Sequence, residues 1–173
     1  AGAAASHRDI QRLAGHARGS DDVGVRDCDA LGAVDGGGVA ELDVLAHILG
    51  RGSNSRLYQK LVVDKNIAVN AGASYDGTTV DNTRFGVYGT PKPGTTLPQL
   101  EQAIDVVIDD LIEHGVTAEE LERAKSRMIA DSVYANDNQR MMAQWYGASL
   151  ATGATVDEVR TWPDRIRLVT AEA

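Results

Sequence analysis

The 173-residue sequence is poor in several residue types, and each shortage excludes a class of protein. Its one cysteine, Cys28, allows no intrachain disulfide and no Cys-x-x-Cys metal or redox site. Apolar runs stay well below the ~20 residues that cross a bilayer, so we expect a soluble protein without a membrane span. The absence of disulfides suits the cytoplasm and also the periplasm.

Positive charge is also scarce. Lys and Arg number 17 against 25 Asp and Glu, which gives a formal net charge of −8. A surface that binds nucleic acid normally has the opposite excess, so we expect no nucleic-acid partner. The remaining composition, with 43% apolar and 24% charged residues, is typical of one globular domain.

The usual motifs of hydrolytic chemistry are missing as well. None of the four histidines, His7, His16, His47 and His114, belongs to a His-x-x-Glu-His zinc motif. No serine lies in a Gly-x-Ser-x-Gly elbow. The residues alone therefore predict no catalytic and no metal-binding residue in this chain.

Residues 1–38 show the least pattern. They are rich in Gly, Ala and Asp and poor in β-branched and aromatic residues, so we predict a poorly defined leader, a loop or a partial strand. Regular spacing begins at residue 39, where Leu42, Leu45 and Leu49 lie on one face of a predicted helix.

A glycine-punctuated turn, Gly50-Arg51-Gly52, follows this helix. The polar group Ser53-Asn54-Ser55 predicts the start of a second helix, with Ser53 or Asn54 as its cap. The turn could also hold an anion at a helix N-terminus, although nucleotide-binding loops follow a strand instead of a helix. Residues 67–75 and 83–90 then predict two strands of an antiparallel hairpin.

The C-terminal half is predicted to be helical. Three Thr-x-x-Glu or Thr-x-x-Gln pairs, which begin at Thr96, Thr117 and Thr155, predict helix starts by capping box, and Pro163 is expected to limit the last helix. On the helix after Thr117, Val133 is among the residues expected to face inward. The predicted fold class is therefore α+β, with a mostly antiparallel sheet packed on one face by helices.

One cluster of large side chains allows two interpretations. Met141, Met142, Trp145 and Tyr146 lie on one predicted helix, from about residue 138 to 150. They could form a binding surface, but their helical spacing favours a place in the core.

Four segments together resemble a known family. The chain is similar to the C-terminal, non-zinc-binding domain of the insulinase or pitrilysin zinc metallopeptidases, in the branch that includes mitochondrial processing peptidase and bacterial zinc proteases. The resemblance covers residues 39–173 and indicates a fragment of a longer chain. The matching segments are Ser55-Arg56-Leu57-Tyr58-Gln59-Lys60-Leu61, Thr90-Pro91-Lys92-Pro93-Gly94, Gly115-Val116-Thr117-Ala118-Glu119-Glu120-Leu121-Glu122-Arg123-Ala124-Lys125 and Val169-Thr170-Ala171-Glu172.

The resemblance implies a division of labour within the parent protein, expected to be a zinc metalloendopeptidase. A separate N-terminal domain of the same chain would bind zinc and hydrolyse the peptide bond, while this domain closes the substrate chamber and helps to bind the peptide. The fragment alone is then expected to be inactive and to bind no zinc. Peptide in such enzymes is held as an added strand on a sheet edge.

Two positions depart from the active members of that family. The Arg and the Tyr that hold substrate there correspond to Val62 and Val69 here, and valine offers no hydrogen bond. A homologous partner subunit could supply both groups. The alternatives are an inactive structural or scaffold homologue, or a free-standing peptide-binding or oligomerising domain, and uncovered sheet edges would also allow a homodimer.

Overall fold

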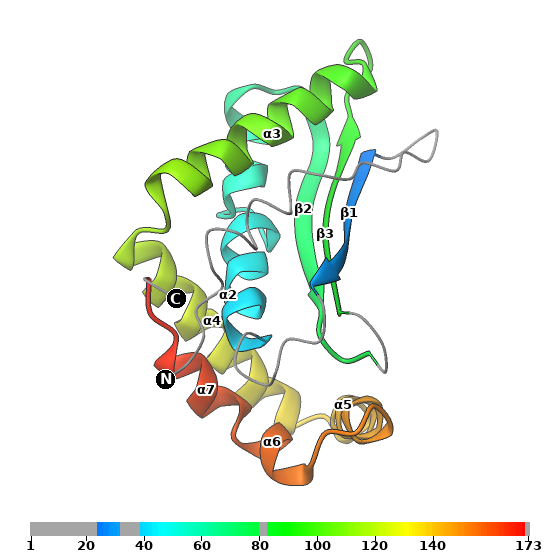
Figure 1. Ribbon diagram of the computed structural model, residues 1–173, viewed down its shortest axis with the longest axis vertical. Coiled ribbons are helices and arrows are strands. Elements are labelled where there is room, and N and C mark those ends of the chain that lie inside the picture. Colours follow the sequence, from blue (N-terminus) through cyan, green and yellow to red (C-terminus); the bar gives the residue numbers. More distant parts are fainter. Residues whose placement is uncertain (1–23, 32–38, 80–82, 172–173) are drawn as a thin grey trace.

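The computed structural model describes residues 24–31, 39–79 and 83–171, of which 24–31 are described for the backbone alone. A small sheet lies beside a helical layer, which confirms the predicted α+β class (Figure 1). The elements are β1 (Gly24–Leu31), α2 (Val39–Gly50), the π-helix η1 (Tyr58–Asp64), β2 (Ala68–Asp76), β3 (Thr83–Pro91), α3 (Leu97–His114), α4 (Ala118–Asn136), α5 (Gln139–Ala151), α6 (Val156–Arg160) and α7 (Trp162–Leu168).

The sheet is antiparallel, with the strand order β1-β3-β2. Strands β2 and β3 form the predicted hairpin, in which Gly72 lies opposite Tyr88 and Ala73 opposite Val87. Along β3, Phe85 and Val87 are buried while Arg84 is exposed, as the alternation predicted. One face of the sheet therefore packs against helices.

Strand β1 decides between the alternatives for part of the N-terminal segment, because residues 24–31 form the partial strand and not a loop. Gly24–Leu31 pairs with β3 over nearly its whole length, with an irregularity between Asp29 and Leu31. Strand propensity depends strongly on the neighbouring strand, and β3 provides a complete row of backbone partners that the composition of residues 24–31 does not reveal. The rest of that segment, residues 1–23 and 32–38, lies outside the described residues.

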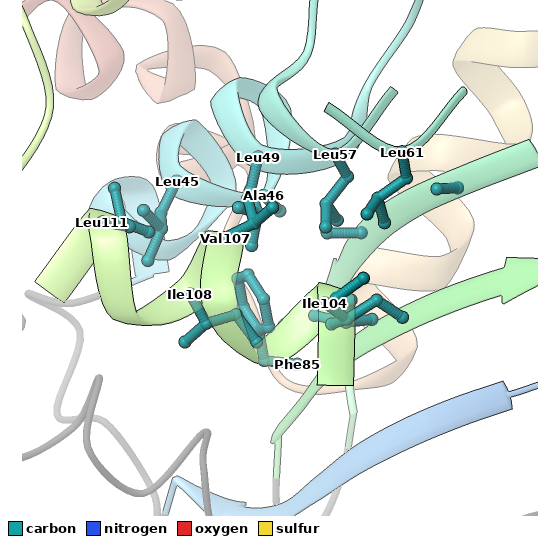
Figure 2. Close-up of a cluster of buried hydrophobic side chains, with 14 of the residues drawn as sticks. Leu45, Ala46, Leu49, Leu57, Leu61, Phe85, Ile104, Val107, Ile108 and Leu111 are labelled. Atoms are coloured by element: carbon teal, nitrogen blue, oxygen red, sulfur yellow. The ribbon is translucent and has the colours of Figure 1, made fainter. Parts of the chain in front are cut away.

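Helix α2 is the centre of the molecule and is buried on two sides. Leu45, Ala46 and Leu49 face a first cluster, which includes Phe85 of β3 and side chains of η1 and α3 (Figure 2). Val44 and Ile48 face a second cluster, which includes side chains of α4 and α7. Figure 1 shows the arrangement, with α2 between the sheet and the pair α4 and α7.

The end of α2 approaches β2 so closely that only glycine fits there. A Cβ atom at Gly50 would lie 1.6 Å from the backbone nitrogen of Ala73 and 2.4 Å from the carbonyl carbon of Gly72. No rotamer change can relieve such a clash, because both atoms belong to the backbone. The glycine thus sets the distance between the central helix and the sheet.

The helix that follows the turn differs from the prediction in two ways. It begins with Arg56, and from Tyr58 to Asp64 it has π-helical geometry, with the Lys65 amide donating to the Lys60 carbonyl at 3.0 Å. Neither Ser53 nor Asn54 caps it by a side chain; instead, the Ser55 hydroxyl donates to the Gly52 carbonyl at 2.8 Å. Spacing alone cannot distinguish a π-helix this short from an α-helix.

Two predictions for the C-terminal helices were wrong. Val133 is 58% exposed, and the neighbouring Ser132 is buried instead. The short helix predicted from Thr155 is α6, which ends at Arg160, before Pro163. It is not the last helix, because α7 follows and has Pro163 in its first turn, where the backbone amide needs no partner within the helix. The capping boxes at Thr117 and Thr155 are confirmed by hydrogen bonds, and at Thr96 the backbone amide donates to Gln99 Oε1.

We expect the substitution Gly50→Ala to destabilise the chain by more than about 3 kcal/mol, because the backbone of β2 must move to admit the methyl group. Gly147→Ala is the matched control, since nothing lies within 4 Å of the added Cβ atom. Alanine there should raise stability by about 0.5–1 kcal/mol. Urea unfolding of the two variants tests this, and equal stability of Gly50→Ala and wild type would contradict the close approach.

Candidate functional site

An ion pair joins two of the segments that resemble the peptidase family. Arg56 Nε and Nη2 donate to the two carboxylate oxygens of Glu120 at 2.7 and 2.8 Å, and Nη2 also donates to the Gly115 carbonyl at 2.8 Å. Both side chains are largely covered, with 14% and 18% exposed. Bidentate pairs of this kind fix geometry as well as charge. The arginine of the Ser-Arg-Leu segment therefore has an architectural role.

The same carboxylate completes the N-terminal cap of α4. The Thr117 amide and hydroxyl both donate to Glu120 Oε2 at 2.9 Å. The hydrogen bond from Arg56, followed by those from Thr117, lowers the pKa of Glu120 from 4.5 to about 2. The capping box predicted Glu120 near the N-terminus of a helix. Its partner Arg56 lies 64 residues earlier in the chain, so the pair could not be predicted from local spacing.

Glu120 should make stability depend on acidity in a defined range. Since its pKa is lower in the folded chain, its contribution is complete above about pH 4.5 and is lost as the pH falls towards 2. We expect Glu120→Gln to cost about 1–2 kcal/mol at pH 7 and much less near pH 2. Chemical unfolding at several pH values measures the loss of stability at pH 7 and near pH 2. Glu119→Gln is the control, because the Glu119 side chain is 88% exposed. A pH-independent loss would contradict the assignment.

Two cavities lie beside the end of α2. The larger one is the candidate site, and we call it the α2–α5 groove. It has a volume of about 640 Å³ and lies where the end of α2, strand β2, helix α4 and helix α5 meet. This volume is within the range of known ligand pockets. Its lining residues are Asp43, Ala46, His47, Gly50, Arg51, Gly52, Ala73, Ser74, Tyr75, Tyr88, Met128, Asp131, Ser132, Ala135, Met141, Trp145 and Trp162.

Aromatic and sulfur-containing side chains form one wall of the groove. Trp145 of α5 contacts Trp162 of α7 edge to face, with ring centroids 5.9 Å apart. Met141 is 51% exposed, and Trp145 and Tyr146 are only partly buried. The prediction that this cluster belongs to the core is therefore wrong. Helix α5 buries only Ser149, which leaves its large apolar side chains available to a ligand.

A carboxyl group lies inside this aromatic wall. Trp162 Nε1 donates to Asp43 Oδ2 at 3.3 Å. Burial raises the pKa of Asp43 from 3.8 to about 6, although this hydrogen bond and the charges of Arg165 and Arg51 act in the opposite direction. Perturbed carboxyl groups in clefts are typical of functional sites. No motif marks Asp43 in the sequence, because it lies on an otherwise ordinary helix.

Asp43 should give the opposite pH dependence to Glu120. Its pKa is raised in the folded chain, so the stability it contributes is complete below about pH 3.8 and is lost as the pH rises through about 6. We expect Asp43→Asn to stabilise the chain by about 1–2 kcal/mol at pH 7 and to abolish that dependence. Urea unfolding between pH 4 and 7 measures it. Destabilisation at pH 7 would show that the ionised carboxylate has a partner that we have not identified.

The residues singled out from the sequence lie in different places. His47 and Arg51 line the groove, whereas His114 ends α3, where its Nδ1 lies 3.2 Å from the Asp110 carbonyl oxygen. Val62 packs partly buried against the first cluster, and Val69 is 55% exposed on β2. Neither valine lines the groove.

Two searches of the described part of the chain are negative. No group of three or more His, Cys, Asp or Glu side chains there could hold a metal ion. Among the same residues, no helix combines the length and the apolar character needed to cross a membrane.

Comparison with known proteins identifies the family. A family model described as the peptidase M16 inactive domain matches residues 34–128, more than half of the chain. The chain belongs to the peptidase M16 inactive-domain family. The resemblance to the non-zinc-binding domain of the insulinase or pitrilysin peptidases is thereby confirmed.

Individual M16 relatives agree with this assignment. The chain is 32% identical over 90 residues to "Uncharacterized zinc protease YmxG" of Bacillus subtilis. The aligned region covers 52% of this chain and 22% of that protein. A protease from Helicobacter pylori has the same fold, with a TM-score of 0.77 at 19% identity over 86% of this chain and 35% of its own. The inactive peptidase domain of a proposed zinc protease from Bordetella parapertussis matches with a TM-score of 0.74 at 19% identity, over 90% of this chain and 82% of its own.

This M16 chain thus spans about a fifth of its Bacillus relative and about a third of the Helicobacter chain. The match to the Bordetella domain, in contrast, extends over most of both chains. The fold is therefore that of an M16 inactive domain.

Proposed function

We propose that this domain is the substrate-holding half of a zinc metallopeptidase, in which a separate N-terminal domain of the same polypeptide binds zinc and hydrolyses the peptide bond. The observation that supports the proposal best is the α2–α5 groove, an aromatic-walled cavity directly beside strand β2. Within the described residues the domain has a place for a ligand and no group that could hold a metal.

Strand β2 would provide the backbone contacts. It is the last strand of the described sheet on its side, because β3 pairs with it on one edge and with β1 on the other. Its residues Ala73, Ser74 and Tyr75 line the groove. Main-chain hydrogen bonds to a sheet edge bind extended peptides with little regard to sequence, as a chamber for varied substrates requires.

The aromatic wall would add side-chain contacts. Trp145 and Met141 are exposed to the groove from α5, while Tyr75 and Tyr88 approach it from the sheet. Aromatic and Met side chains are enriched where proteins bind peptides, because they provide large contact areas that adapt to different ligands. An apolar peptide side chain would be covered there.

Val62 and Val69 have hydrocarbon side chains, so a partner subunit would have to supply the polar groups that hold substrate in active members. The resemblance assigns them to the positions of the substrate-holding Arg and Tyr in active members, and neither valine can polarise a carbonyl group. In an active enzyme a homologous subunit would therefore supply both groups. The same two valines favour the second candidate, a catalytically inactive scaffold homologue with a peptide-binding groove.

We expect Trp145→Ala to weaken peptide binding by the 173-residue chain about tenfold, because a partly exposed Trp is a typical anchor of a peptide interface. The probe is a fluorescein-labelled mixture of randomised decapeptides, followed by fluorescence anisotropy. Tyr134→Ala is the matched control, since Tyr134 is 74% exposed on α4 and does not line the groove. Equal loss in both variants, or no binding by wild type, would contradict the groove as a peptide site.

The complete polypeptide separates the two candidate functions. A His-x-x-Glu-His motif upstream and cleavage of a quenched fluorescent peptide would support the peptidase, and Trp145→Ala should then raise KM with little change in kcat. Peptide binding without such a motif or cleavage would support the scaffold. A fall in kcat with unchanged KM would contradict a substrate-holding role for the groove.

A further inference from the structure

A second cavity lies next to the α2–α5 groove, and His47 and Arg51 line both. It has a volume of about 310 Å³ and is bordered by the turn after α2 and by one face of α4. We call it the arginine cavity. The lining residues that could bind a ligand are His47, Arg51, Ser53, Asn54, Arg123 and Arg127.

The charge of this cavity is opposite to that of the chain. Three arginines and a histidine face two carboxylates, in a molecule whose formal net charge is −8. One of the carboxylates, Glu120, is already held by the guanidinium of Arg56. Among the lining residues, the three guanidinium groups therefore outnumber the carboxylates that are still available to them.

The three arginines differ in how far they are neutralised. Arg127 pairs with Asp131 at 3.2 Å and Arg123 with Glu119 at 3.5 Å, both within α4 and both well exposed. Such exposed pairs are worth little and exchange readily. The Arg51 side chain, in contrast, forms no hydrogen bond and no ion pair with any residue that the structure describes, and its charge acts on the Asp43 carboxyl group only through space.

The turn adds further donors beside Arg51. Ser53 and Asn54 line the cavity, and their backbone amides form no hydrogen bond within the described part of the chain. The hydroxyl of Ser55 is occupied, since it donates to the Gly52 carbonyl. Free amides next to a guanidinium are the combination that binds oxyanions in many proteins.

The positive charge of the cavity acts on the pKa of His47. Burial is the main reason why the pKa of His47 is lowered, and the charges of Arg51 and Arg127 lower it further, against the opposing effect of Asp131. An anion bound between the two arginines would act in the opposite direction. The histidine can therefore report on occupancy of the cavity.

We propose that the arginine cavity binds an anionic group, a carboxylate or a phosphate, with the Arg51 guanidinium as its principal partner. Guanidinium groups bind both anions through two parallel hydrogen bonds. Because Arg51 also lines the α2–α5 groove, an acidic residue of a groove-bound peptide could supply the carboxylate. A free phosphate could bind without any peptide, so the site does not depend on the proposed function.

The test is an NMR titration of the His47 imidazole with inorganic phosphate, with sodium chloride at matched ionic strength as the reference. Wild type should bind phosphate saturably, and the pKa of His47 should rise by about one unit. Arg51→Gln should reduce the affinity about tenfold or more. Arg140→Gln, at an exposed arginine of α5 that lines neither cavity, is the matched control and should bind like wild type.

Several outcomes of that titration would overturn the site. They are a linear, non-saturating response to phosphate, an unchanged affinity in Arg51→Gln, or an equal loss in Arg140→Gln. The unfolding midpoints of both variants are measured alongside, and Arg51→Lys provides a second test. Lysine keeps the charge without the two parallel donors, so it should recover only part of the affinity.

A second titration distinguishes the two sources of the anion. An acetylated decapeptide with one central Glu is compared with the same peptide carrying Gln. If only the Glu peptide displaces phosphate, the site holds a substrate carboxylate. If phosphate binds but neither peptide displaces it, the site holds a free small anion, and loss of peptide binding in Trp145→Ala still tests the groove separately. Absence of binding by both phosphate and the Glu peptide would reject the site.

Discussion

The close approach of α2 to β2 at Gly50 is the constraint on which the rest of the structure depends. Helix α2 is buried on both sides, so any change in its distance from the sheet would open one cluster and compress the other. The helix ends where Gly50 meets the backbone of Gly72 and Ala73, and the chain then turns. Both cavities described above lie beside that turn.

The family segments have a structural explanation that follows from this arrangement. The Ser-Arg-Leu segment begins just after the turn, and its Arg56 reaches Glu120 at the start of α4. Leu57, next to it, is fully buried in the first cluster. The two segments thus hold the turn after α2 and the N-terminus of α4 together, which keeps the walls of both cavities in place. The chemistry proposed for the site comes from other residues.

Local patterns in the sequence were sufficient for most of the fold. The periodicity of Leu42, Leu45 and Leu49 predicted α2, and alternation predicted the β2–β3 hairpin, because both depend on neighbours along the chain. For residues 1–38 the sequence left a loop and a partial strand as alternatives. It could not locate β1, since the pairing of this strand with β3 depends on a partner more than 50 residues away. The π-helical geometry of η1 also leaves no clear spacing signal.

The candidate site was much harder to predict than the fold. Trp145 and Met141 have the spacing of core residues, and only the three-dimensional position of α5 shows that nothing within the described chain covers them fully. Asp43 lies on a helix whose other polar positions are ordinary. Its pKa is raised by burial, against the lowering effect of the hydrogen bond from Trp162, which lies 119 residues later in the chain. Sites assembled from distant elements have no local signal.

The central claim is that peptide binds in the α2–α5 groove along β2. Hydrogen–deuterium exchange of the chain, with and without a tightly binding member of the decapeptide mixture, tests it most directly. The account predicts added protection in residues 68–76 of β2 and residues 139–146 of α5, with little change in α3. Protection confined to other elements, or none despite saturating peptide, would contradict it.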